Sequence, residues 1–584
     1  MRFIYMLIAA AILFSAAGCT DNNTTNVIGF ERTLVIITDH VPESETILGI
    51  MGAVKQNYPE VDIQFIKCKS FDIFESGYLL ELTSQVYPDN TCFAILVDPG
   101  ADSKKIAFQS GNKLVLAPDN GSTTKIRVIF PPATIHYVDN VSLFEGNYTK
   151  ITDVPSDIFY RDAILNLLSG KPISSFGTVC SNPVELQIQN PTEIGNIISG
   201  QILLTDNFGN CTTNITKQFT AKFQQGDLLE FNSDDITFYA KFGVSYSSVA
   251  INENVAFINS KGNLEVAVNY GNISDRYDLN GGDIITLKKA KLIAGILRYN
   301  SSELVDNIIS GMKSELTAKG FIEGKDIEYI EKNAQGDISK FPSLISELLS
   351  ANVNIVIPVS TSASQAALQY IPAEIPIVYT YVTSPEFAGL INKRINTTGL
   401  SDATNFDDYL KFVKELVPNL QKAGRIYNPA EANSAFSQDR FNSLGNFYGI
   451  SYDNEIVSSD NQITSAFNGL KTLGISTILI AADNTLNLGM KNLAELCKSN
   501  NVILIGDSEE NVTDGALASI SVDYDMLSKA TGVTAGNVIL GSPADKIAIQ
   551  RFPTSVITLN QSTANTIGFT FSQEMKSKAH KIIQ

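Results

Sequence analysis

The sequence predicts a fusion of an α/β domain, a small β-rich domain, and a second α/β domain with two lobes. The chain has 584 residues, and single hydrophobic cores stop growing at roughly 250–300 residues. Short apolar runs alternate with amphipathic helical stretches near both ends of the chain, which is typical of parallel α/β sheets. Between them, from about residue 197 to residue 287, short strands with turns follow one another, which indicates a β domain.

The composition and the residue spacing argue against a nucleic-acid-binding protein and a metalloprotein. The net charge is −18, and Lys and Arg are scattered with no basic stripe, so the sequence argues against a nucleic-acid partner. His40, His136 and His580 lie far apart and none has a Cys or Glu at ligand spacing, so no metal site is expected. Six dispersed cysteines without a CxxC pair favour isolated buried thiols over a disulfide framework.

Residues 1–19 have the features of a signal peptide: Arg2, an apolar stretch over residues 3–14, and small residues before Cys19. The alternatives are a signal with an incidental cysteine, or a simple anchor. The small residues end directly at Cys19 and polar residues follow, which resembles the lipobox of bacterial lipoproteins. This resemblance implies lipidation of Cys19, a tether over residues 20–31, and an extracytoplasmic protein held at the membrane by its lipid.

Residues 32–190 are predicted to form an α/β domain whose strands end at acidic residues. A strand over residues 34–38 ends at Asp39, a helix over 47–54 follows, and a strand over 92–97 ends at Asp98. A third such point is Asp119-Asn120, followed by glycine. Carboxylates at the carboxyl ends of strands lie where α/β proteins build their binding sites.

These positions resemble the S-adenosyl-L-methionine (SAM) hydroxide adenosyltransferase family, which is related to the fluorinases. The matching segments are Thr38-Asp39, Val97-Asp98-Pro99-Gly100, Pro118-Asp119-Asn120-Gly121, Arg161-Asp162, Thr205-Asp206-Asn207-Phe208-Gly209-Asn210, and Asn259-Ser260-Lys261-Gly262-Asn263-Leu264-Glu265. The resemblance implies an α/β domain followed by a small β-barrel over residues 191–288. It also implies a homotrimer that binds SAM and uses water to release adenosine.

By this resemblance, Asp39 would hold the ribose hydroxyls, Asp206 the amino-acid end of the ligand, and Asn210 the adenine edge. Asp119, Asn120 and Phe208 belong to the same ligand-binding motifs. The structural alternative for each polar residue is a turn or a strand end, where Asp and Asn are common.

The catalytic residues depart from the family pattern. Asp98 is present, but Lys105 (or Lys104) stands where the hydrolases have Arg, and Phe159 stands where they have His. Lysine keeps the charge but loses the planar guanidinium, and phenylalanine cannot transfer a proton. His40 and His136 are the remaining substitutes. We therefore expect a domain that has lost hydrolysis and binds a nucleoside-like ligand such as SAM or adenosine, with no cofactor.

The second α/β domain is expected over residues 289–584. A strand over 292–297 is followed by a helix whose apolar residues recur with helical spacing from Val305 to Leu316. Further strands are predicted at 327–330, 353–358, 375–380, 425–427, 477–481 and 502–505, and helices at 341–349, 409–416 and 486–497. The series is too long for one compact sheet, so two lobes are predicted: about 289–403 with part of the C-terminus, and 404–522.

This half resembles the ABC transporter substrate-binding proteins of the tryptophan/tyrosine type. The matching segments include Ser360-Thr361-Ser362-Ala363, Val382-Thr383-Ser384-Pro385, Thr398-Gly399-Leu400-Ser401-Asp402, Asn428-Pro429-Ala430-Glu431-Ala432-Asn433-Ser434 and Ala482-Asp483-Asn484. The resemblance implies a periplasmic-binding-protein-like fold that holds an amino-acid or nucleoside-like solute between its lobes. It also implies an ABC transporter permease as partner.

The candidate solute ligands are polar residues at strand ends, namely Ser360, Thr361, Ser362, Thr383, Ser384, Glu431, Asn433, Ser434, Asp483 and Asn484. The hydroxyls after residue 358 would receive a carboxylate at a helix N-terminus, or would simply cap that helix. Asp483 would pair with an ammonium group or cap the next helix. Tyr379 and Tyr381 would stack on an aromatic ligand or lie in the core.

Three functions remain open at this stage. The favoured one is a lipid-anchored receptor that closes around a solute and delivers it to a permease. The rival is an exported enzyme that hydrolyses SAM to adenosine and methionine, with a capture domain attached. The third is a double binder in which both halves capture parts of one metabolite.

Overall fold

The computed structural model describes residues 32–99, 103–553 and 555–584. The predicted lipidation at Cys19, the signal peptide and the tether lie outside these residues. The chain divides into two compact units, Met1–Leu186 and Gln187–Gln584.

The first unit is an α/β domain, as the sequence predicts. Its sheet has the order β2-β1-β3-β5-β4-β6, in which β4 and β6 run antiparallel to their neighbours and the other pairs are parallel. The strands are β1 (Thr33–Thr38), β2 (Asp62–Lys67), β3 (Cys92–Ile95), β4 (Lys105–Ser110), β5 (Lys113–Pro118) and β6 (Ile135–Tyr137). One face packs on α1 (Glu45–Asn57) and α4 (Ser156–Leu168), and the other on α2 (Ile73–Val86) and α3 (Thr124–Ile129).

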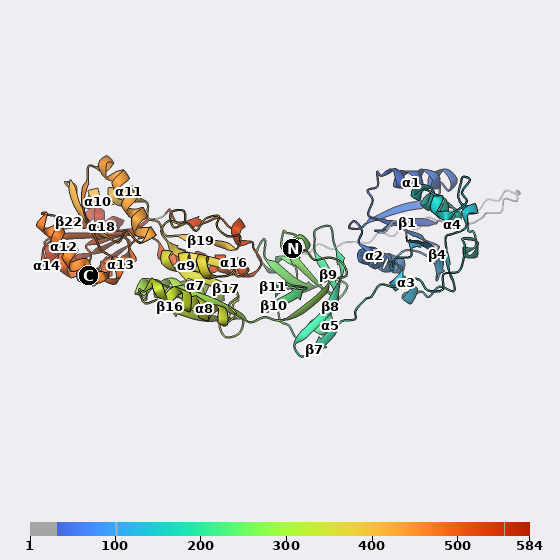
Figure 1. The fold of residues 1–584 in the computed structure, drawn as a ribbon, viewed down its shortest axis with the longest axis horizontal. Helices are drawn as coiled ribbons and strands as arrows, with labels where there is room; N and C mark the ends of the chain where they lie inside the picture. The colour runs from blue at the N-terminus through green and yellow to red at the C-terminus, as the bar shows by residue number, and fades with distance from the viewer. Residues whose placement is uncertain (1–31, 100–102, 554) are drawn as a thin grey trace, which may run out of the picture. The chain divides into compact units, whose positions relative to one another are not determined.

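The second unit begins with a β-barrel (Figure 1). The strand order β14-β10-β11-β12-β13-β9-β8 closes because β8 also pairs with β14, and β7 extends the edge of β8. The strands are β7 (Thr192–Ile194), β8 (Ile197–Thr205), β9 (Cys211–Thr216), β10 (Leu228–Ser233), β11 (Ile236–Phe242), β12 (Asn254–Ile258), β13 (Asn263–Val268) and β14 (Ile284–Lys289). Two short helices, α5 (Lys217–Thr220) and α6 (Ile273–Tyr277), lie in its loops.

The barrel is followed by a first α/β lobe with the sheet order β16-β15-β17-β18-β19-β25, all parallel. Its strands are β15 (Leu292–Arg298), β16 (Ile327–Asn333), β17 (Ile355–Val359), β18 (Ile377–Val382), β19 (Thr397–Ser401) and β25 (Gln550–Arg551). Helices α7 (Glu303–Ala318) and α16 (Tyr524–Ile539) cover one face, and α8 (Phe341–Ser350) and α9 (Thr361–Tyr370) the other.

The second lobe has the sheet order β21-β20-β22-β23-β24-β26-β27. Its strands are β20 (Lys422–Tyr427), β21 (Ser451–Ile456), β22 (Thr477–Leu479), β23 (Ile503–Gly506), β24 (Ala518–Val522), β26 (Ser555–Asn560) and β27 (Lys581–Ile583). Its helices are α10 (Phe406–Leu416), α11 (Ala432–Tyr448), α12 (Ile463–Thr472), α13 (Asn484–Leu488), α14 (Met490–Ser499), α15 (Glu509–Thr513), α17 (Gln561–Ile567) and α18 (Gln573–Lys578).

Two details differ from the prediction. The second lobe is predicted to end at residue 522. The chain after it does enter the first lobe, as α16, a short 3-10 turn (Ala544–Lys546) and β25, but it then returns, and β26 pairs antiparallel with β24 in the second lobe. The helix predicted over residues 486–497 is two helices, α13 and α14, because the chain breaks at Gly489. An added Cβ at Gly489 would lie 2.3 Å from the Ile463 side chain, so this position has no room for a larger residue.

The barrel and the first lobe share a core. Leu228 of β10 is fully buried in the cluster that contains the sheet and helices of the first lobe, and Tyr239 packs against the same cluster. The Tyr239 hydroxyl accepts a hydrogen bond from the Asn354 amide at 2.8 Å, and Lys319 forms an ion pair with Glu253 at 3.0 Å. Because of these contacts, the barrel forms one compact unit with the C-terminal half and not with the α/β domain before it.

Candidate functional site

The N-terminus of α9 carries the first three predicted ligand residues of the first lobe. Ser360 precedes this helix with φ of 108°, a conformation that a serine rarely adopts, and its hydroxyl accepts a hydrogen bond from the Ala363 N–H at 3.3 Å. Ser360 and Thr361 are buried, and Ser362 is half-buried. Backbone held in a sparsely populated region is characteristic of functional sites.

A carboxyl group from the end of β19 belongs to the same lobe. Asp402 is buried, and its Oδ1 has no hydrogen-bond partner among the described residues. Burial raises the pKa of Asp402 to about 7, and a hydrogen bond from Thr383 acts in the opposite direction. Ser384, in contrast, stabilises a local turn, in which its hydroxyl accepts a hydrogen bond from the Phe387 N–H at 3.3 Å.

In the second lobe, the predicted ligand residues Glu431 and Asp483 form hydrogen bonds to neighbouring residues of the same lobe. The Glu431 carboxylate accepts hydrogen bonds from the N–H groups of Asn484 and Thr485 at 2.8 and 3.0 Å. Asp483 caps α13 through the Leu486 N–H at 2.9 Å and accepts a hydrogen bond from the Ser434 hydroxyl at 2.6 Å. Asp483 therefore has the capping role, one of the two roles the sequence left open.

The neighbouring amides are placed differently. Asn433 lies in the first turn of α11 and Asn484 opens α13, and both are buried. The Asn433 Oδ1 and the Asn484 Nδ2 have no hydrogen-bond partner among the described residues. A buried polar atom without a partner costs about 1–3 kcal/mol, so these two atoms and Asp402 Oδ1 mark places where a bound polar molecule would supply the missing partner.

Sequence reasoning missed residues of this site. Asp507 follows β23, and Asp402 and Asp507 line one small cavity together with Thr383 and Tyr409. The rings of Tyr381 and Tyr524 meet edge to face at 5.8 Å beside these carboxyls. The signal that would have found Asp507 is the same one that indicated Asp483, an acidic residue directly after a buried strand.

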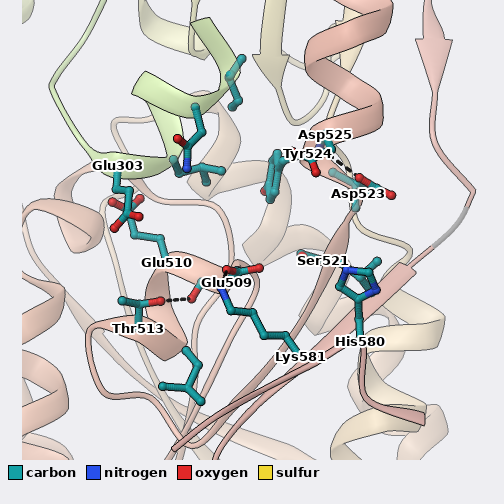
Figure 2. A pocket seen from close by; sticks show the side chains of 16 residues that line it. Glu303, Glu509, Glu510, Thr513, Ser521, Asp523, Tyr524, Asp525, His580 and Lys581 are labelled. Carbon is teal, nitrogen blue, oxygen red and sulfur yellow. Dashed lines mark hydrogen bonds and ion pairs between the residues drawn. The ribbon is translucent and has the colours of Figure 1, made fainter. Parts of the chain in front are cut away.

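A larger hollow of about 560 Å³ lies between the lobes (Figure 2). Figure 2 shows Glu510 of α15 beside Glu303 at the start of α7, and Glu509 paired with Lys581. Burial raises the pKa of Glu510, and hydrogen bonds from Ser302 and from the N–H groups of Leu304 and Glu303 oppose this effect. Glu510 of the second lobe thus caps a helix of the first.

In the first unit, the structure brings the predicted catalytic pair together. Lys105 Nζ donates to Asp98 Oδ2 at 2.7 Å, and the Ser103 hydroxyl donates to the other oxygen of Asp98. The Asn120 side-chain amide donates a hydrogen bond to the carbonyl of Val97, two residues after the end of β3, at 2.9 Å. Asp119 accepts a hydrogen bond from the Val184 N–H at 2.8 Å, and Asp39 accepts one from the Phe71 N–H at 2.9 Å.

The residue at the family's histidine position lies in the core. Phe159 is buried and stacks on Phe144 with ring centroids 4.9 Å apart. The two histidines considered as substitutes are placed elsewhere: His136 lies on β6, where its Nδ1 is 2.9 Å from the Gly177 carbonyl oxygen, and His40 is exposed. Neither imidazole has an interaction with Asp98 among the described residues.

In the barrel, Asp206 and Asn210 bind each other. Asp206 accepts hydrogen bonds from the Asn210 N–H and side-chain amide at 2.8 and 2.9 Å, which is the turn role that the sequence left open. Asn210 also contacts Tyr246, whose hydroxyl donates to Glu265 at 2.6 Å. The Phe208 ring is 77 % exposed at the tip of the same turn.

No group of three or more His, Cys, Asp or Glu side chains among the described residues has an arrangement that could hold a metal ion. No helix within the described ranges has both the length and the apolar character needed to cross a membrane. The five cysteines in these ranges are all buried and free.

Comparison with known families accounts for both halves. The family model described as ABC transporter substrate binding protein matches residues 294–583. The models described as SAM hydroxide adenosyltransferase N-terminal domain and C-terminal domain match residues 34–177 and 200–286. The chain is an ABC substrate-binding domain fused to a SAM hydroxide adenosyltransferase-like domain.

Individual relatives match one half each. The substrate-binding half is similar to the "Tyrosine-binding protein" of Clostridioides difficile (strain R20291), with 28% identity over 284 residues, which is 48% of this chain and 81% of that protein. The adenosyltransferase-like half is similar to the "Fluorinase" of Actinoplanes sp. (strain N902-109), with 23% identity over 308 residues, covering 46% of this chain and 99% of that protein.

Solved structures resemble the substrate-binding half as well. The structure described as the ABC domain in complex with L-Trp from Streptococcus pneumonia has a TM-score of 0.48 and 24% identity. It covers 50% of this chain and 100% of that chain. The resemblance of both halves to known families, inferred above from the motifs, is confirmed by the family models.

Proposed function

We propose that the protein is an extracytoplasmic solute receptor of an ABC transporter and that its solute is an amino acid. The observation that carries the proposal is that three buried atoms in the segments of the substrate-binding motifs, Asp402 Oδ1, Asn433 Oδ1 and Asn484 Nδ2, have no hydrogen-bond partner among the residues described. A zwitterion offers an ammonium group for the carboxyl and amide oxygens and a carboxylate for the amide N–H. The name of the C. difficile relative supports the amino-acid class.

The test is calorimetry on the purified chain from residue 20 onward, titrated with L-tyrosine, L-tryptophan and a panel of other amino acids. A saturable heat with one of them, lost in Asn484→Ala and kept in the exposed variant Asn468→Ala, supports the receptor. Absence of binding across the panel, with nucleosides included, rejects an amino-acid or nucleoside receptor.

For the N-terminal domain, we propose a binding domain that does not hydrolyse SAM. Phe159 is packed against Phe144 in the core, so the position carries no proton-transfer group. A lysine replaces the planar guanidinium beside Asp98. Asp39, Asp119 and Asn120 remain at the carboxyl edge of the sheet, where a SAM or adenosine ligand would bind without any cofactor.

The alternative, a SAM hydrolase, is favoured by one observation. The Asp98–Lys105 pair keeps a charged side chain beside the family's catalytic carboxylate, at 2.7 Å. Incubating the full chain with SAM and measuring adenosine separates the two functions. Adenosine release that disappears in Asp98→Ala would establish the enzyme, whereas SAM binding without adenosine supports a binding domain.

Membrane attachment and assembly are further parts of the proposal. The motif at Cys19 supports a lipid anchor, and the chain then acts with a separate permease. A homotrimer through the adenosyltransferase-like half is the assembly that the family resemblance implies. Mass spectrometry of the mature N-terminus and light scattering of the soluble chain test these two points.

A further inference from the structure

Two carboxyl groups from different lobes line one small cavity. Asp402 follows β19 of the first lobe and Asp507 follows β23 of the second, and both line a cavity of about 10 Å³. Its other lining residues are uncharged: Thr383, Thr404, Phe406, Tyr409, Ser437, Ala481 and Ala482. A cavity of this size holds about one small group, such as a water molecule or an ammonium head.

The lining of the cavity supplies no counter-charge. None of its lining residues is Lys, Arg or His. Asp402 is buried and its Oδ1 has no hydrogen-bond partner among the described residues. A metal ion is not indicated, because no suitable group of three or more ligands occurs in the described ranges.

The two carboxyls also act on each other. Burial raises the pKa of Asp507 to about 7, and the nearby Asp402 adds to this effect. At pH 8 both groups are therefore mainly ionised, and two like charges in a low-dielectric site repel each other. The repulsion grows as the lobes approach, since each lobe carries one of the pair.

We propose that Asp402 and Asp507 make lobe closure depend on a positively charged group of the solute. When both carboxylates are ionised and no cation lies between them, their repulsion disfavours the closed arrangement in which they share this cavity. A primary ammonium between the two carboxylates makes that arrangement favourable. The pair therefore selects solutes that carry an amine, and it rejects analogues of the same shape that lack the charge. This inference rests on the proposed receptor function and deepens it.

The test uses pulsed electron–electron double resonance on the chain from residue 20 onward at pH 8. Spin labels are placed through Gln369→Cys on α9 and Asn468→Cys on α12, which are exposed positions on different lobes. Asp402→Asn and Asp507→Asn keep the shape of the side chain and remove the charge. Asp439→Asn, an exposed position on α11, is the matched control.

We expect the unliganded wild type and Asp439→Asn to be open, and each Asn variant of the pair to raise the closed-to-open ratio by roughly tenfold, which corresponds to about one pKa unit of repulsion. L-tyrosine should close the wild type, whereas L-3-(4-hydroxyphenyl)lactate, which has a hydroxyl in place of the ammonium, should not. Unliganded Asn variants that stay as open as the wild type, or a wild type that is already closed at pH 8, would overturn the proposal.

The two proposals fail in different ways. If no amino acid binds in calorimetry, the receptor function fails, while the unliganded Asn variants still report on the carboxyl pair. If L-tyrosine and L-3-(4-hydroxyphenyl)lactate close the wild type equally, the charge dependence fails and the receptor function stands. Circular dichroism of each variant confirms that the fold is intact.

Discussion

Glu431 Oε2 accepts a hydrogen bond from the backbone N–H of Asn484 at 2.8 Å. A carboxylate at the start of α11 therefore fixes the start of α13, and with it the amide that lacks a partner among the described residues. The predicted ligand residue Glu431 thus acts on the site through Asn484.

Replacing Glu431 tests this positioning role. Glu431→Gln loses a charged acceptor shared by Asn484, Thr485 and Asn428, so the free energy of unfolding should fall by about 1.5–3 kcal/mol. Solute affinity should fall as well because the Asn484 amide is no longer held. Urea unfolding and calorimetry measure the two effects, and Glu495→Gln on the exposed side of α14 is the control. Unchanged affinity would show that Asn484 is positioned by other contacts.

The buried carboxyls predict a pH dependence of stability. The pKa of Asp402 and that of Asp507 are raised to about 7 by burial, above the usual value of 3.8. Between pH 3.8 and about pH 7, the folded state therefore binds more protons than the unfolded state. Because of this, the contribution of each carboxyl to the free energy of unfolding falls as the pH rises through this range. The expected slope is up to about 1.4 kcal/mol per pH unit for each carboxyl.

The measurement is the difference in unfolding free energy between Asp402→Asn and wild type, followed from pH 4 to pH 8. The variant should gain stability relative to wild type as pH rises through this range and reach a plateau above about pH 7. A difference that stays constant with pH would contradict the raised pKa of Asp402.

Arg425 predicts an unusual response to substitution. Its guanidinium is buried, and the rings of Phe441, Tyr452 and Tyr427 lie 4.2, 5.2 and 5.6 Å from it. Burial lowers its pKa to about 10, and its Nη1 has no hydrogen-bond partner within the described ranges. Replacing a buried ion pair by apolar side chains of similar volume is often neutral or stabilising by about 1–4 kcal/mol, and we expect the same of a buried guanidinium whose charge contacts three rings.

Arg425→Met should therefore keep or raise the free energy of unfolding in urea. Arg425→Lys should lower it by about 1–2 kcal/mol, because an ammonium group loses the planar stacking on three rings. Loss of stability in Arg425→Met that exceeds the loss in Arg425→Lys would mean that the charge itself is required.

Phe159 predicts that a simple reversion will not restore hydrolysis. Its ring is part of the core between α4 and the sheet, so Phe159→His should destabilise the first unit by about 1–3 kcal/mol. The double variant Lys105→Arg and Phe159→His should release no adenosine from SAM above background. Chromatographic detection of adenosine, with thermal unfolding in parallel, checks both parts, and measurable turnover would show that the introduced imidazole can reach the carboxylate of Asp98.

The strand and helix pattern was largely predictable because it depends on local periodicity. Residues 292–297 and the helix after them are β15 and α7, and the switch to short strands near residue 197 is the start of β8. The return of residues 555–583 to the second lobe was not predictable in this way. It depends on the pairing of β24 with β26, a long-range contact that leaves no periodic signal.

For the candidate site, the sequence predicted where the polar residues lie better than it predicted what each of them does. The predicted ligand residues Glu431, Asn433, Asp483 and Asn484 all lie at or near helix starts that follow strands. Only the structure shows which of their polar atoms have a hydrogen-bond partner among the described residues and which do not. Asp402 belongs to a family motif, whereas Asp507 belongs to none of the motifs quoted above. Their relation depends on two lobes meeting, which no local pattern records.

The core shared by Leu228 and the first lobe has a practical consequence for dividing the molecule. The boundary between the matched families falls at residues 286–294, yet the compact unit continues through it and starts at Gln187. Cutting the gene at the family border would expose an apolar surface that the barrel normally covers. A receptor fragment should therefore start at residue 187, so that the barrel remains attached to the first lobe, with which it shares a core.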